Sequence, residues 1–87
     1  MSDYSEVAAA QLDELEKTAA DPSWEAIVDA LELALKYPGE AQKHSTAIAT
    51  TEGEVILRLP VAGFPPYKVF WSHRDGVPRI EAVFPHP

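Results

Sequence analysis

The sequence predicts an α+β fold in which an N-terminal helical hairpin packs on a three- to four-stranded antiparallel sheet. Apolar residues recur at helical spacing over residues 5–36. Pro38-Gly39 then ends the helical pattern, and the rest of the chain is rich in β-branched and aromatic residues separated by short turn sequences. Because 87 residues amount to one domain, residues 1–87 are expected to fold as a single unit.

The first helix is predicted over about residues 5–20. Its apolar residues are spaced by four, three and four positions, which places them on one stripe. The stripe consists of Ala8, Leu12, Leu15 and Ala19. Ser2 or Ser5 is suited to the N-cap, where a hydroxyl can accept a hydrogen bond from a free backbone N–H.

The second helix is predicted over about residues 22–36. Asp21 suits the N-cap and Pro22 the first turn, where the missing N–H of proline costs nothing. Its apolar stripe consists of Trp24, Ile27, Val28, Leu31 and Leu35. Tyr37-Pro38-Gly39 ends the helix, and the polar stretch from Gly39 to Ser45 is expected to be a loop or a frayed helical turn.

Two strands are predicted next, over residues 46–51 and 54–59, with Glu52-Gly53 as the turn of a hairpin. Side chains alternate between the two faces of a strand. One face of the second strand must therefore pack on the helices. That face is expected to carry Val55, Leu57 and Leu59.

Two further strands are predicted over residues 67–72 and 79–84, with Asp75-Gly76 in the turn between them. Strict alternation in the last strand places Ile80, Ala82 and Phe84 on one face, and Arg79, Glu81 and Val83 on the other. Aromatic residues are numerous here: Tyr67, Phe70, Trp71 and Phe84. Such residues beside amphipathic helices are more often core than a platform for stacking nucleic-acid bases.

The charge is distributed unevenly along the chain. Residues 1–53 carry eleven acidic and three basic side chains, whereas residues 54–87 carry three acidic and four basic ones, within a net charge of -7. A strongly acidic protein does not bind nucleic acid through its whole surface. The C-terminal part can nevertheless meet an anionic partner while the helices remain acidic.

Several classes of protein and site are disfavoured. The acidic N-terminus is unlike a secretory signal and no apolar run is long enough to span a bilayer, so we expect a cytoplasmic protein without membrane contact. Without cysteine, disulfides and thiolate metal sites are excluded. His44, His73 and His86 match no usual spacing of metal ligands. We expect no metal and no cofactor.

The order of two helices followed by three or four antiparallel strands resembles the RelE/ParE family of toxin proteins. The closest local similarity is Pro66-Tyr67-Lys68-Val69-Phe70-Trp71, which is similar to the "Y-R-V-x-Y" strand of that family. The segment from Arg79 to Phe84 is similar to the family's final strand. The segment from Glu54 to Leu59 fits the strand that precedes the "Y-R-V-x-Y" strand. The family's N-terminal strand would have only Asp3-Tyr4 to occupy.

The resemblance implies a toxin of a bacterial type II toxin–antitoxin module that needs no cofactor. One branch of the family cleaves messenger RNA on the ribosome, and another poisons DNA gyrase. In the RNA-cleaving branch, basic side chains hold phosphate and stabilise the charge that develops in the transition state. Arg58, Lys68 and His86 fall where such residues occur, and His86 could serve as general acid or base.

Three functional hypotheses follow from the resemblance. The first is a toxin-like protein that acts by protein binding, as a gyrase inhibitor or a degenerate toxin, and is neutralised by a cognate antitoxin wrapping its helices or its open sheet edge. The second is a ribosome-dependent mRNA endonuclease that uses Arg58, Lys68 and His86. The third is a non-toxic interaction domain, with a homodimer formed through exposed sheet edges.

Overall fold

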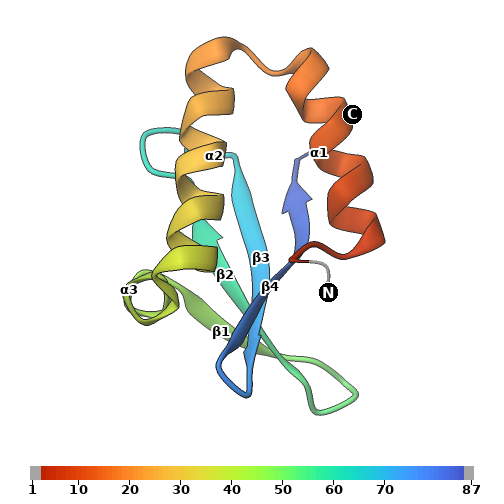
Figure 1. Ribbon diagram of the computed structural model, residues 1–87, viewed down its shortest axis with the longest axis vertical. Coiled ribbons are helices and arrows are strands. Elements are labelled where there is room, and N and C mark those ends of the chain that lie inside the picture. The colour runs from red at the N-terminus through yellow and green to blue at the C-terminus, as the bar shows by residue number, and fades with distance from the viewer. Residues whose placement is uncertain (1–2, 86–87) are drawn as a thin grey trace.

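The computed structural model describes residues 3–85 and confirms the α+β fold (Figure 1). The helices and strands are α1 (Glu6–Thr18), α2 (Asp21–Lys36), α3 (Pro38–Lys43), β1 (Thr46–Ala49), β2 (Val55–Pro60), β3 (Lys68–Arg74) and β4 (Val77–Phe84). The four strands form one antiparallel sheet in the order β1-β2-β3-β4.

Helix α1 begins with a side-chain cap that also attaches it to the sheet. The Ser5 hydroxyl accepts a hydrogen bond from the Ala8 amide at 3.0 Å and donates one to the Glu81 carbonyl at 2.7 Å. The cap satisfies one of the free N–H groups at the start of the helix. One short side chain therefore fixes both where α1 begins and where it lies on β4.

The start of α2 and the segment after it differ from the expectations. Asp21 is the first residue of α2 and does not cap it, because Ala20 occupies the N-cap position without a side-chain hydrogen bond. The segment expected to be a loop or a frayed turn is the short helix α3, which begins at Pro38 directly after α2. Proline is favourable in a first helical turn, and burial of Ala41 holds α3 against the core.

All three helices pack on the same face of the sheet. Helix α1 lies against β4, α2 lies against β3 and β4, and α3 lies against β2. In Figure 1 the two long helices descend from their connection at the top, and the upper ends of β3 and β4 lie between them in this view. The hairpin ends of the strands extend past the helices, which explains why Val55, expected on the buried face, is 52% exposed.

The core lies between this face and the helices. Its largest fully buried side chains are Trp71, Ile27, Ile80, Val61, Val69 and Val83. Trp71 also donates a hydrogen bond from its indole N–H to the Ser45 hydroxyl at 3.1 Å. The polar end of the largest core residue is thus satisfied, as burial requires.

A bulge in β4 makes one sequence prediction wrong. Phe70 pairs with Ala82 whereas Trp71 pairs with Ile80, so Glu81 is an extra residue between the two pairs. An extra residue reverses the alternation of side chains beyond it. Ile80 and Val83 therefore share the buried face, and Phe84, predicted on the face of Ile80, is 44% exposed on the other side.

The β3–β4 hairpin is longer than predicted. Asp75 and Gly76 form its whole turn, with φ angles of 51° and 77°. Two consecutive residues with positive φ match the twist of an antiparallel pair, so pairing continues up to Arg74 and Val77. At the first hairpin β1 is shorter than predicted, because it ends at Ala49, whereas β2 has the predicted length and lies one residue later.

A buried polar contact joins the middle of α1 to the end of β4. The Gln11 side-chain oxygen accepts a hydrogen bond from the Val83 amide at 2.6 Å, and Gln11 is 6% exposed. Val83 lies two residues beyond the bulge, where its amide faces α1 and, within residues 3–85, has no strand beyond β4 to pair with. Gln11 therefore satisfies a backbone donor that would otherwise be buried alone.

We expect Gln11→Ala to lower the free energy of unfolding by about 1–3 kcal/mol, because it leaves the buried Val83 N–H without an acceptor. Denaturation with urea measures the change. The control is Gln42→Ala, which removes the same side chain from an exposed position on α3 and should shift stability by less than about 0.5 kcal/mol. Equal effects of the two substitutions would contradict the role given to Gln11.

Candidate functional site

The face of the sheet opposite the helices is not covered by any helix within residues 3–85, and we call it the open face. Alternation along the strands, corrected for the bulge, assigns its side chains. They are Thr46 and Ile48 on β1, Ile56, Arg58 and Pro60 on β2, Lys68, Phe70, Ser72 and Arg74 on β3, and Val77, Arg79, Glu81, Ala82 and Phe84 on β4. This face contains both of the described residues that the sequence singled out as candidate site residues.

Arg58 and Lys68 lie on neighbouring strands of the open face. Arg58 pairs with Phe70 and Lys68 pairs with Pro60, so the two cations occupy diagonal positions across β2 and β3. Such diagonal neighbours in an antiparallel sheet are about 7–8 Å apart, within reach of one bound anionic group. The third predicted site residue, His86, lies outside the described residues.

Arg58 is held in an unusual environment for a cation. It is half-buried, with Thr46 of β1 on one side and Phe70 of β3 on the other. Its Nε atom is buried and has no hydrogen-bond partner among the described residues. A buried unpaired donor destabilises the fold by about 1–3 kcal/mol, so packing alone does not favour arginine at this position.

Two aromatic rings lie on the open face beside the cations. Phe70 and Phe84 pack edge to face, with ring centroids 5.6 Å apart and planes at 80°. The expectation that the strand aromatics are core is right for Trp71, which is fully buried, and wrong for these two. The bulge at Glu81 is the reason for Phe84, since it transfers that side chain to the face of Phe70.

The other end of the open face is a shallow polar hollow of about 260 Å³ lined mostly by charged residues. The buried Ser72 hydroxyl donates a hydrogen bond to the Glu81 carboxylate at 2.7 Å. Arg74 forms an exposed ion pair with Glu54 at 2.8 Å, and this hydrogen bond raises the pKa of Arg74 above its ordinary value. These pairs cannot be recognised in the sequence, because only strand register brings the partners together.

The site has cations but lacks a well-placed proton acceptor. His73 lies on the helix side of β3, 6.0 Å from the Trp71 ring, and His44 ends α3. Within residues 3–85, no histidine therefore lies on the open face, and Glu81 is engaged by Ser72. The arrangement can bind and orient an anion, whereas removal of a proton has no evident agent in the described part of the chain.

No protein-family model, curated protein or solved structure matches this chain in the comparisons made. Over the described residues, His, Asp and Glu side chains form no group of three or more that could hold a metal ion. None of the helices in residues 3–85 has the length and apolar character needed to cross a bilayer. The function must therefore be argued from the surfaces themselves.

We expect Arg58→Met to leave the free energy of unfolding unchanged or to raise it by up to about 1 kcal/mol, because it keeps the packing and removes the buried unpaired donor. Thermal and chemical denaturation both measure the effect. Arg79→Met, which makes the same change at an exposed position, serves as control and should change stability by less than about 0.5 kcal/mol. A loss of more than about 1 kcal/mol in Arg58→Met alone would show that arginine is there for structural reasons.

Proposed function

We propose that this protein is a toxin-like component of a type II toxin–antitoxin module that acts in the cytoplasm by binding a target protein through its open face. One observation carries the proposal: half-buried Arg58 lies beside Phe70 and Lys68 on a face that no described helix covers. Phe84 packs against Phe70 on the same face. Arginine and aromatic residues dominate the binding energy of protein interfaces. A gyrase-inhibitor-like activity is the member of this class that needs only binding.

The strand arrangement supports the RelE/ParE resemblance at its N-terminal end. Tyr4 forms a parallel bridge with Ile80, in which the Ile80 amide donates to the Asp3 carbonyl at 2.8 Å and the Ser5 amide donates to the Ile80 carbonyl at 2.9 Å. Residues 3–5 thus lie along the free side of β4, as a minimal N-terminal strand would. This is the position left for such a strand, because α1 begins immediately afterwards.

The helical side of the molecule suits a neutralising antitoxin. Eleven of the fourteen acidic side chains lie in residues 1–53, which contain all three helices. Complementary charge accelerates association and selects the partner. The cognate antitoxin is therefore proposed to carry basic residues along the segment that contacts the helices.

A second candidate function is ribosome-dependent cleavage of messenger RNA. The observation in its favour is the diagonal placement of Arg58 and Lys68, which would set two positive charges against one phosphate. Fixed cations stabilise a phosphate that gains charge in the transition state. Lysine lacks the bidentate geometry of arginine, and no described group is placed to deprotonate a ribose hydroxyl, so binding ranks ahead of catalysis.

Induced expression of the intact protein in a bacterial host is expected to arrest growth. Growth curves, with the amount of folded protein checked by immunoblot and circular dichroism, measure the effect. Growth at the uninduced rate with folded protein present would refute the toxin proposal.

A pair of variants separates the two candidate functions. If the protein acts by binding, Arg58→Met should relieve growth arrest and raise the colony count at least tenfold, because it removes an interface anchor. In that case the parent protein should cause no cleavage of transcripts. If it is an endonuclease, sequencing of RNA ends should reveal cleaved transcripts with the parent and none with Arg58→Met or Lys68→Met. Lys17→Met, at an exposed position on α1 away from the open face, is the control and should remain toxic in both cases.

A further inference from the structure

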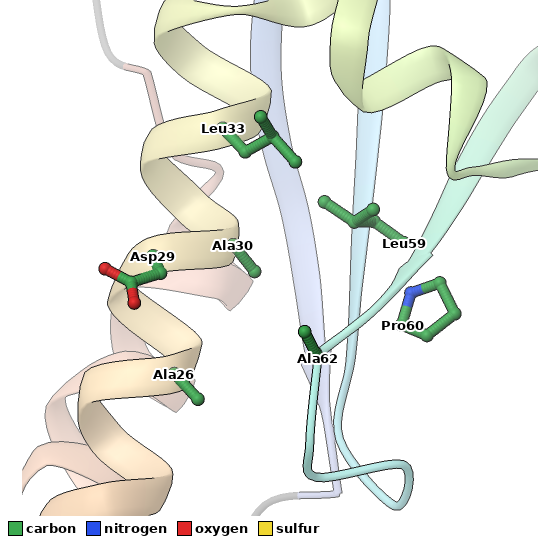
Figure 2. A pocket seen from close by; sticks show the side chains of 7 residues that line it. All are labelled: Ala26, Asp29, Ala30, Leu33, Leu59, Pro60 and Ala62. Atoms are coloured by element: carbon green, nitrogen blue, oxygen red, sulfur yellow. The ribbon is translucent and has the colours of Figure 1, made fainter.

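A second surface lies on the helix side of the sheet, where α2 borders the end of β2. Residues at positions 26, 30 and 33 of α2 form an apolar stripe that faces Leu59 and Ala62 (Figure 2), and Pro60 borders the same hollow at the end of β2. Two open hollows of about 150 and 420 Å³ share Leu33 and those three residues. They therefore form one continuous groove, which we call the α2–β2 groove.

The α2–β2 groove exists because α2 has more apolar surface than the sheet covers. Helix α2 packs on β3 and β4 with Ile27 and Leu31 in the core. In the neighbouring stripe Ala30 is buried, whereas Ala26 and Leu33 are only half-buried. Strand β1 pairs with β2 only as far as Arg58. Beyond that point β2 has a neighbouring strand on the β3 side alone, and the flank of α2 is left open.

The charges beside the groove identify the kind of occupant. Asp29 borders the groove, and Figure 2 shows its carboxylate pointing to solvent on the side of α2 away from Leu59 and Ala62. Glu25 and Glu32 lie four residues before and three residues after Asp29, so the three exposed acids form a row along this border. Lys36 is the one basic side chain in α2 and follows at the C-terminal end of that row.

We propose that the α2–β2 groove binds an amphipathic segment of a partner protein that presents leucine-sized side chains to Leu33 and Leu59 and lysine or arginine to Asp29. Small residues on α2 leave room for such side chains, and apolar anchors in a groove with complementary charge beside it are a common mode of peptide recognition. Anionic partners are disfavoured by the acidic row. That the partner is the antitoxin rests on the proposed function. The new element is the place at which the antitoxin binds.

Two synthetic helical peptides of equal length test the proposal. Both carry leucine at every third or fourth position; one has lysine and the other glutamate at the intervening positions. Fluorescence anisotropy against the full chain is expected to show binding of the lysine peptide at least tenfold tighter than that of the glutamate peptide. Amide chemical shifts should move at Ala30, Leu33, Leu59 and Ala62, rather than over the acidic face of α1.

Substitutions at exposed positions locate the contact without disturbing the fold. Ala62→Trp should fill the groove and abolish binding of the lysine peptide, and Asp29→Lys should weaken it roughly tenfold. Asp13→Lys on α1 makes the same change of charge away from the groove and should weaken binding by less than about threefold. Absence of binding, or equal loss with Asp29→Lys and Asp13→Lys, would overturn the proposal.

The groove and the toxin proposal can fail separately. Growth arrest measured without any partner depends on the open face and should persist in Ala62→Trp, since Ala62 lies outside that face. Specific peptide binding by a chain that does not arrest growth would support the groove and refute the toxin. Growth arrest by a chain that binds neither peptide would refute the groove and leave the toxin proposal standing.

Discussion

The attachment of α1 to β4 is the interaction on which the rest of the structure depends. Three hydrogen-bonded contacts make it: Ser5 to the Glu81 carbonyl, Gln11 to the Val83 amide, and the backbone pairing of residues 3–5 with Ile80. They lie on either side of the bulge at Glu81, which turns both Ile80 and Val83 toward the helices. Without the bulge, one of these two residues would face solvent, and α1 would have no apolar surface to cover at the end of β4.

The two candidate surfaces follow from this arrangement. Because α1 and α2 both pack on β4, the helical layer is centred on one side of the sheet, and Pro60 at the end of β2 and Ala62 beyond it remain exposed. The α2–β2 groove is the result on the helix side. On the other side, nothing within residues 3–85 covers Phe70 and Arg58, so an apolar ring and a cation share a surface that a sheet of this size would ordinarily bury or make polar throughout.

The sequence was sufficient to predict the two long helices and the four strands, but not helix α3 or the irregularities within the elements. Periodicity located both long helices, and the resemblance singled out Arg58 and Lys68, which strand register places on one face. The bulge at Glu81 was not predictable, because no glycine or proline marks it and only pairing with β3 reveals the extra residue. Gln11 lies next to a predicted apolar position and looks like a surface residue, since its partner is seventy-two positions away. The second apolar stripe of α2 consists mainly of alanines. Alanine is common on both the buried and the exposed side of a helix, so periodicity does not show that these residues form a stripe.

The two surfaces bear on each other through β2. Leu59 lines the groove on the helix side and Arg58, its neighbour in the chain, lies on the open face, so one strand separates the two sites by the thickness of a sheet. A segment confined to the groove leaves Arg58 accessible and could not block a target by direct contact. Neutralisation through this groove therefore requires the segment to continue around the end of β2, past Pro60, and onto the open face. The short β1 strand leaves that path free, because its pairing with β2 stops at Arg58.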